Sequence, residues 1–433
     1  MRIVVQDGTV IDPANGLEAD LDLLIEEGVI RELGQPGGFA SAEAQRIDAS
    51  GCVVAPGLID MHVHLREPGY EYKETVLTGT QAAVAGGFTA VACMANTNPI
   101  NDNGAVTRFI VEQARSAGLA RVFPIGALSK GLHGEELAEI GEMIEAGAVA
   151  LPDDGRSVMD HNLMRRALEH CSMFDVPISV HEEDLCLSSG GSMNEGPTSV
   201  RLGIRGVPSV AEDVMVARDI ALARLTRGRV HIAHISTRRS VDLVRQARVE
   251  GLAVTAEVAP HHFTLTEEAV EGYNTNAKMS PPLRLADDVA AMKDGLRDGT
   301  IDAIATDHAP HHRDEKEVEF DQAAHGVTGL ETALPLTLHL VRDGVLSLSE
   351  AIRKLTVNPA RILGLPSGTL AVGKPADLTL FDAHASWRLD PLAARSRSQN
   401  TPFAGWELTG KVRLTMVDGR IVYDDREQEG QPA

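Results

Sequence analysis

The chain alternates between short apolar segments and longer amphipathic ones, and this alternation restricts its fold more than any other feature. Helix-like segments lie between the apolar ones, and several end at a glycine, as helices often do. Strands that alternate with helices eight times are typical of a (β/α)8 barrel of the TIM type, which is an α/β fold. The alternative is an open doubly wound sheet, but no G-x-G-x-x-G sequence follows a strand. The eight predicted strands are residues 57–65, 88–96, 120–128, 148–154, 177–183, 229–236, 253–260 and 302–310.

Both ends of the chain have a different pattern. The first 54 residues and the region after residue 375 contain short β-type runs, such as RIVVQ and KVRLTMV, separated by turn signals such as DG. We therefore expect a small β-sandwich-like domain assembled from both termini, residues 1–54 and 366–433. Residues 55–365 would form the catalytic barrel.

The first predicted barrel strand carries an H-x-H sequence. Because side chains alternate along a strand, His62, His64 and Arg66 should share one side, with Met61 and Val63 on the other. Two neutral imidazoles at this spacing can bind one divalent cation, and histidine is a common metal ligand. The alternative is a pair of structural histidines.

Polar residues recur at the carboxyl ends of the predicted strands. Active sites of such barrels lie at this face, so we expect one site to gather nearly all of them. Each alone has a structural explanation, such as a turn before a glycine, a helix cap or a buried histidine. So many at one edge favour a metal centre. They are His62, His64, Asn96, Asp153, Asp154, His181, His234, His261, His262 and Asp307.

Composition excludes several classes of partner. The chain has 40 basic and 62 acidic residues and a net charge of −22, which disfavours nucleic acid and anionic membranes. A small anionic substrate would need a local cationic pocket. The four cysteines form no C-x-x-C pair, which is typical of reduced thiols in the cytosol. No apolar leader or run of 18 apolar residues is present, so we expect a cytoplasmic protein.

Longer motifs resemble a known family, the metal-dependent amidohydrolases, and within it the dihydroorotases of the bacterial class I type. The H-x-H strand and the aspartate after the last strand are shared across that superfamily. Narrower segments are similar to dihydroorotases in particular. These are NTNP, DDG, MNEG and DHAPH.

The resemblance implies a set of ligands for one or two zinc ions per subunit, with two expected. It implies that His62, His64 and Asp307 bind one zinc, that His181 and His234 bind a second, and that Asp154 lies between them. It also implies substrate contacts from Arg66, Asn96, Ser280, His311, His325 and Gly326. The sequence departs from the family pattern at Ala95, where proline is usual, and at Ser280, where asparagine is common.

By this resemblance, the chain is a dihydroorotase, with Asp307 as catalytic base. It would interconvert N-carbamoyl-L-aspartate and dihydroorotate in pyrimidine biosynthesis.

The enzymatic alternatives are allantoinase and dihydropyrimidinase or hydantoinase. Those relatives bridge their metals with a carboxylated lysine, whereas residues 141–170 contain no lysine. A third alternative is a non-catalytic scaffold for aspartate carbamoyltransferase, but all six ligand positions are filled. The resemblance also implies a homo-oligomer and aspartate carbamoyltransferase as a partner.

Overall fold

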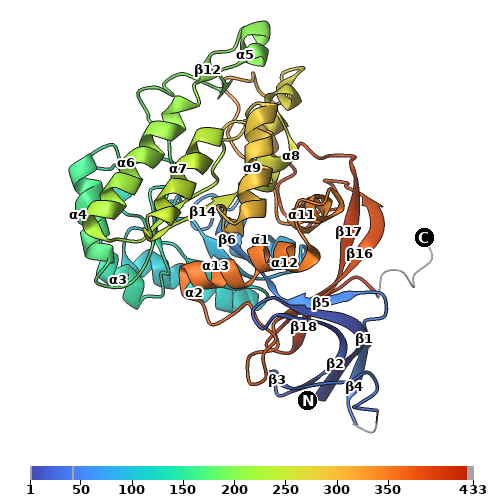
Figure 1. Ribbon diagram of the computed structural model, residues 1–433. Coiled ribbons are helices and arrows are strands. Elements are labelled where there is room, and N and C mark those ends of the chain that lie inside the picture. The colour runs from blue at the N-terminus through green and yellow to red at the C-terminus, as the bar shows by residue number, and fades with distance from the viewer. Residues whose placement is uncertain (1, 41–42, 427–433) are drawn as a thin grey trace.

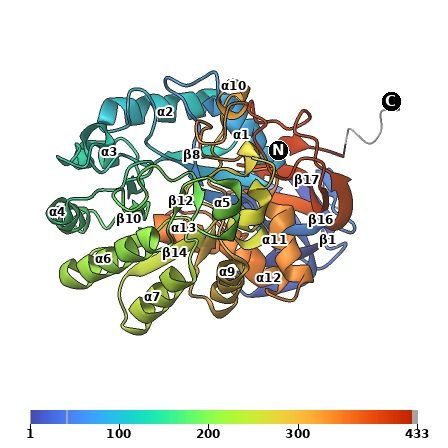
Figure 2. The same ribbon diagram turned by 90° about the horizontal axis from the view of Figure 1, so that it is seen from above.

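The computed structural model of the protein describes residues 2–40 and 43–426. Eight short parallel strands form the centre of the molecule, as the sequence predicts (Figure 1, Figure 2). The predicted (β/α)8 barrel is confirmed. Its strands are β6 (Leu58–Val63), β7 (Phe88–Cys93), β8 (Arg121–Pro124), β9 (Leu151–Pro152), β10 (Ile178–Val180), β13 (Val230–Ile232), β14 (Val254–Val258) and β15 (Ala303–Ile304).

Backbone hydrogen bonds close the ring between two runs of paired strands. One run has the order β15-β14-β13-β10-β9, and the other is β6-β7-β8. Val149 N donates to Pro124 O at 3.0 Å, which joins the residues just before β9 to the end of β8. His64 N donates to His308 O at 2.8 Å, which joins β6 to the residues after β15. All eight carboxyl ends therefore meet at one edge.

A helix follows each barrel strand and packs outside the ring (Figure 2). Local sequence signals set several helix ends. Asn103 and Asp160 accept hydrogen bonds from the first-turn N–H groups of α2 and α4, and Gly118, at φ 64°, ends α2. The helices are α1 (Val76–Ala85), α2 (Gly104–Ala117), α3 (Ile140–Glu145), α4 (His161–Cys171), α6 (Val210–Thr226), α7 (Arg238–Val249), α9 (Ala286–Asp298) and α11 (Ala333–Arg342).

Shorter elements interrupt the connections that follow the carboxyl ends of the strands. The excursion between β10 and α6 carries α5 and β12, which Figure 1 places at the opposite end of the molecule from the N-terminus. These connections supply the walls above the barrel. Their elements are η1 (Lys130–Leu132), β11 (Met193–Asn194), α5 (Pro197–Leu202), β12 (Gly206–Val207), α8 (Pro260–Thr264), η2 (Glu267–Val270), η3 (Thr275–Ala277) and α10 (Arg313–Lys316).

Two further helices, α12 (Leu348–Leu355) and α13 (Val357–Leu363), lie at the amino ends of the strands. Ile362 of α13 packs in one buried cluster with Met61 and Ala92 of the barrel. Lys354 Nζ donates to Ile301 O at 2.7 Å, immediately before β15. The amino end of the barrel is therefore covered, which leaves the carboxyl edge for a functional site.

The two termini form one sheet, as predicted. Its order is β18-β17-β16-β5-β1-β2-β3, and β4 pairs with β1. Strands from opposite ends of the chain meet where Leu378 of β16 lies opposite Pro56 of β5. The bounds are β1 (Arg2–Asp12), β2 (Leu17–Glu26), β3 (Val29–Gly34), β4 (Gln45–Asp48), β5 (Val53–Pro56), β16 (Leu378–Arg388), β17 (Glu407–Val417) and β18 (Arg420–Asp424).

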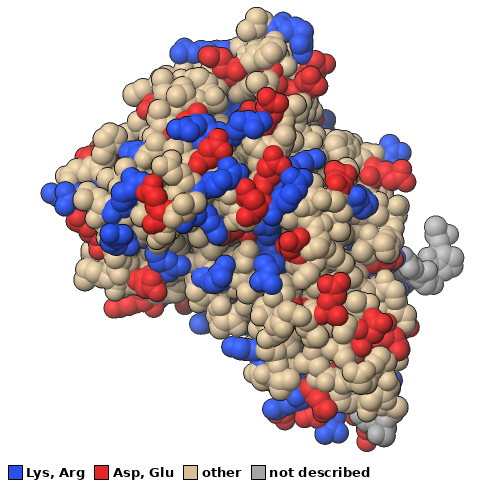
Figure 3. All heavy atoms as spheres, in the orientation of Figure 1, with Lys and Arg blue, Asp and Glu red and all other residues tan. Residues whose placement is uncertain are grey.

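No surface of a single charge sign stands out on the face shown in Figure 3. Basic and acidic side chains are interspersed across it, over the region of α4, α6, α7 and α9. Among the described residues, no helix has the length and apolar character needed to cross a bilayer. The four cysteines are free thiols.

Burial of Lys354 should make stability depend on pH. Burial lowers the pKa of Lys354 from 10.5 to about 8. Between these values the unfolded chain binds the proton and the folded protein does not, so the free energy of unfolding should rise with pH. Lys354→Met should reduce this rise, to which the buried Lys316, with a pKa lowered to about 7, also contributes. Urea unfolding at about pH 7.5 and about pH 10 measures it, with Lys374→Met, at an exposed turn, as the control that keeps the wild-type slope.

Candidate active site

Strand β6 brings His62 and His64 to the carboxyl edge of the barrel. Glu257 Oε1, on β14, accepts from His62 Nδ1 at 2.8 Å. Asn96 Oδ1, after β7, accepts from His64 Nδ1 at 2.8 Å. Each ring therefore directs its Nε2 toward the centre of the site. Contacts of this kind orient metal-binding imidazoles and fix their tautomer.

The alternation predicted for this strand is wrong in one respect. The pairing of β6 with β7 shifts register between Asp60 and Val63. Met61 packs with residues of α13, whereas Val63 belongs to the larger cluster that includes the outer helices, so the two do not share a side. Asp60, which pairs with Val91 just before the irregularity, accepts through Oδ1 from His62 N and Thr306 N at 3.1 Å each.

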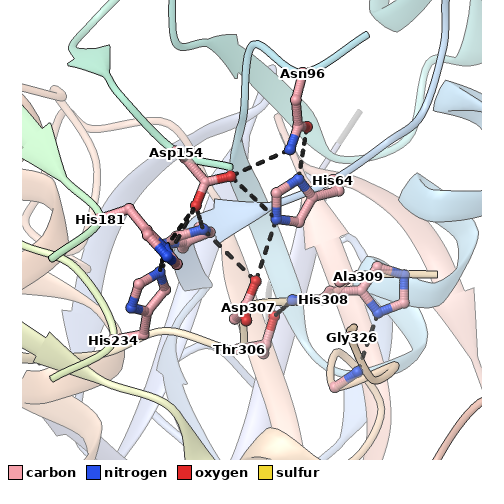
Figure 4. A network of polar contacts seen from close by, with 12 residues as sticks. His64, Asn96, Asp154, His181, His234, Thr306, Asp307, His308, Ala309 and Gly326 are labelled. Atoms are coloured by element: carbon pink, nitrogen blue, oxygen red, sulfur yellow. Dashed lines mark hydrogen bonds and ion pairs between the residues drawn. The ribbon is translucent and has the colours of Figure 1, made fainter. Parts of the chain in front are cut away.

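Asp154 lies between two groups of histidines (Figure 4). Asn96 Nδ2 donates to Asp154 Oδ2 at 3.2 Å and fixes the orientation of the carboxylate. The preceding Asp153 has a different role, because its oxygens accept from Val158 N and His181 N. Asp154 Oδ1 lies 3.5 Å from His62 Nε2, 3.6 Å from His234 Nε2 and 3.7 Å from His181 Nδ1, and Oδ2 lies 3.7 Å from His64 Nε2.

The structure brings the other predicted ligands to the same place. His181 Nδ1 lies 3.0 Å from His234 Nε2. Asp307 Oδ1 lies 3.2 Å from His64 Nε2 and 3.6 Å from His62 Nε2. His234 and Asp307 have φ angles of 31° and 48°, in a region that non-glycine residues rarely adopt. Such backbone strain persists only where the surrounding structure holds it, and it is frequent at active sites.

The buried charges of the site are balanced against one another. Burial alone would raise the pKa of Asp154, but His234 and His62 hold it well below its ordinary value. Burial opposes a proton on His62, yet Asp154 and Glu257 raise its pKa well above the ordinary value. The carboxylates thus attract positive charge into a buried site. A divalent cation supplies such charge and displaces the protons.

The spacing of these atoms fits ligands of a common cation. Two ligands about 2.1 Å from a tetrahedral ion lie about 3.4 Å apart, close to the 3.5 to 3.7 Å separations around Asp154. His62 Nε2 is buried without a hydrogen-bond partner among the described residues. Asp307 lies beside the first ligand group but belongs to neither. The two groups that could hold a metal are His62, His64 and Asp154, and Asp154, His181 and His234.

A cavity of roughly 430 Å³ opens beside the shared aspartate. Arg66 is buried in its wall, with Nε donating to Pro310 O at 3.1 Å and Nη2 lying 3.3 Å from His311 Nε2. Ser280 Oγ donates to Glu183 Oε2 at 3.1 Å. The lining includes every residue for which the resemblance implies a substrate contact: Arg66, Asn96, Ser280, His311, His325 and Gly326.

Two of those residues have their backbone groups engaged. Gly326 N donates to Lys278 O at 2.9 Å, and His325 O accepts from His311 Nε2 at 2.8 Å. These bonds fix the wall of the cavity. Gly326 has a φ of 136°, and a Cβ there would lie 2.6 Å from Ala309 Cβ, so only glycine fits.

Sequence analysis missed two acidic residues of this region. Glu257 contacts both His62 and His231, and an acid inside the apolar run VTAEV was a usable signal, because a buried charge needs a partner. Glu183 lies 3.1 Å from His181 Nε2. His262, which follows a predicted strand, instead donates to Pro281 O.

The closed barrel and its paired His/Asp groups define a metal-dependent hydrolase of the barrel class. A family model described as "Amidohydrolase family" matches residues 53–422. Dihydroorotases from Syntrophotalea carbinolica and Pelobacter propionicus are 56% and 55% identical over 423 residues, which cover 98% of this chain and 99% and 100% of theirs. The chain therefore belongs to the amidohydrolase family and, within it, to the dihydroorotases.

Solved structures agree on the fold. L-Hydantoinase (dihydropyrimidinase) from Arthrobacter aurescens superposes with a TM-score of 0.86 at 26% identity, covering 98% of this chain and 96% of that one. Dihydropyrimidinase from Brevibacillus agri superposes with a TM-score of 0.85 at 22% identity over the same shares.

Removal of the shared carboxylate should empty the site of metal. We expect the purified protein to carry divalent metal and to lose it to a chelator. Asp154→Asn should lower the metal content, since this residue belongs to both ligand groups. Asp160→Asn is the control and should keep the metal, because Asp160 is exposed and caps α4 through one oxygen, which an asparagine retains. Equal metal in both variants, measured by elemental analysis, would contradict this assignment.

Proposed function

We propose that the chain catalyses the reversible interconversion of N-carbamoyl-L-aspartate and (S)-dihydroorotate with two zinc ions. The observation that carries the proposal is the buried guanidinium of Arg66 in the same cavity as the shared carboxylate of Asp154. A cyclic amide that bears a carboxylate matches both, because the ring needs a hydrolytic centre and the carboxylate needs a cation.

Arg66 is suited to bind the substrate carboxylate. A planar guanidinium binds a carboxylate through two parallel hydrogen bonds. The structure engages Nε and places Nη2 near His311, and it gives Nη1 no partner among the described residues. Burial together with Arg66 lowers the pKa of His311 to about 3, so this imidazole is neutral. The cavity therefore presents the guanidinium of Arg66 to an anionic ligand in a chain of net charge −22.

His62, His64 and Asp307 would hold one zinc and His181 and His234 the second, with Asp154 between them. When bound, the zinc ions supply the Lewis acidity that lowers the pKa of the attacking water and polarises the ring carbonyl. Asn96 supports this arrangement through its contacts with His64 and Asp154. Imidazole and carboxylate donors suit zinc.

Asp307 is placed to act as the base. His64, with the charges of His62 and His234, keeps the pKa of Asp307 below its ordinary value despite burial, so the group is a carboxylate at neutral pH. It can accept a proton from the attacking water and return it to the leaving ring nitrogen. The amide bond then breaks with protons balanced. The reverse sequence closes the ring.

Asp307→Asn should separate binding from proton transfer. The amide occupies the same space but cannot accept a proton, so kcat should fall by about 10²- to 10⁴-fold. We expect a folded protein with a KM for dihydroorotate close to that of the wild type. Near-normal turnover would show that the base lies elsewhere.

Substrate choice tests the proposal against the hydantoinase and allantoinase alternatives. Their carboxylated lysine has no counterpart in residues 141–170, which contain no lysine. Dihydroorotate, allantoin, dihydrouracil and hydantoin should be assayed side by side with zinc. Dihydroorotate should be preferred, and Arg66→Met should lower kcat/KM for it by about 100-fold, because a buried charge contact is lost. Equal efficiency on an uncharged ring would overturn the assignment.

We also propose that the enzyme forms a homo-oligomer in the cytoplasm and binds aspartate carbamoyltransferase. The support is the identity of more than half of the residues to bacterial dihydroorotases and the four free thiols.

A further inference from the structure

The connection between β16 and β17, residues 389–406, reaches the back of the cavity wall and places Asn400 there. The Asn400 side chain is 3% exposed, and all of its hydrogen-bonding groups are engaged. Oδ1 accepts from His311 N at 3.0 Å, and Nδ2 donates to Ala309 O and Gly326 O at 3.0 Å each. The cavity lining includes Ala309, His311 and Gly326 but not Asn400.

Asn400 joins two segments that form one side of the cavity. Besides its side-chain bonds, Asn400 O accepts from Thr328 N at 2.9 Å, and Ala309 N donates to Val327 O at 2.8 Å. The side-chain amide of Asn400 therefore bridges residues 309–311 and Gly326, and it adds to the direct backbone bond between Ala309 and Val327. These segments follow β15 and precede α11, whereas Asn400 comes from beyond the barrel.

This contact continues to Arg66. Pro310 O, which accepts from Arg66 Nε at 3.1 Å, belongs to the same peptide group as His311 N, which donates to Asn400 Oδ1. A shift of residues 309–311 would therefore move the carbonyl that orients the guanidinium. The same shift would move the imidazole of His311, which lies 3.3 Å from Arg66 Nη2.

Other residues replace Asn400 only in part. Gly326 O also accepts from Lys316 Nζ at 3.1 Å. For Ala309 O and His311 N, Asn400 is the side-chain partner that the described part of the chain provides. Loss of this amide would leave both groups buried and unpaired, and the segment would move to satisfy them.

We propose that Asn400 is a positioning residue that orients Arg66 and His311 through the backbone of residues 309–311 and so sets the affinity for the anionic substrate. The inference rests on the proposed function. Asn400 lies outside the cavity lining, and its side chain bonds to none of the proposed metal ligands. By this role of Asn400, the connection between β16 and β17, which lies beyond the barrel in the sequence, becomes a determinant of substrate binding.

The test compares Asn400→Asp, Asn400→Ala and wild type on dihydroorotate. Asn400→Asp keeps the shape and the bond from His311 N, but it directs a second acceptor at two carbonyl groups. We expect kcat/KM to fall about tenfold or more in both variants, mainly through KM, with zinc content unchanged. Gln399→Ala, at the exposed neighbouring position, is the matched control and should behave as wild type.

A double-mutant cycle with Arg66→Met separates positioning from general destabilisation. If Asn400 acts through Arg66, the double variant Asn400→Asp with Arg66→Met should be little worse than Arg66→Met alone. Additive losses would overturn the inference. Loss of zinc or of the native circular dichroism spectrum together with activity would assign Asn400 a structural role and overturn it as well.

The outcome for the wild type keeps the two proposals apart. If wild type with zinc does not act on dihydroorotate, the proposed function fails and the inference fails with it. If wild type is active and the Asn400 variants have a normal KM, the inference alone fails.

Discussion

The carboxylate of Asp154 is the group on which the candidate active site depends. Both of its oxygens face imidazole nitrogens at 3.5 to 3.7 Å. These nitrogens belong to four histidines at the carboxyl ends of three barrel strands, β6, β10 and β13. In a buried site, removal of one charge leaves its partners uncompensated, which is strongly destabilising. The remaining polar groups are arranged around this carboxylate, and a cation shared through it would balance the site.

The barrel supports that arrangement by strained and irregular backbone at its carboxyl edge. Strand β6 shifts register before His64, and His234 and Asp307 adopt positive φ angles. Buried acids just outside the site bond to β6. Asp60 bonds the backbone of β6, and Glu257 holds the His62 ring. The energy of the fold therefore maintains a geometry that local preference disfavours.

The fold alone does not distinguish the members of the family. The Arthrobacter aurescens L-hydantoinase superposes with a TM-score of 0.86 at 26% identity, so the same barrel also occurs in a protein named for a different activity. Distinction comes from the site. Here an aspartate lies between the histidine groups, and a buried arginine lines the cavity. The wall that holds this arginine depends on a residue from the terminal segment, Asn400.

The sequence by itself determined the barrel, the sheet made from both termini and the candidates for the site, because strand length, turn residues and polar strand ends are local patterns. Family motifs separated Asp154 from Asp153. Only the tertiary structure decided which side chains support the candidates. Glu257 meets His62 across 195 residues of chain, and Asn400 meets His311 across 89. The tertiary structure also decided the register shift in β6, which the sequence did not predict because strict alternation of side chains assumes an ideal strand. Such contacts depend on how distant segments pack, which no local pattern records.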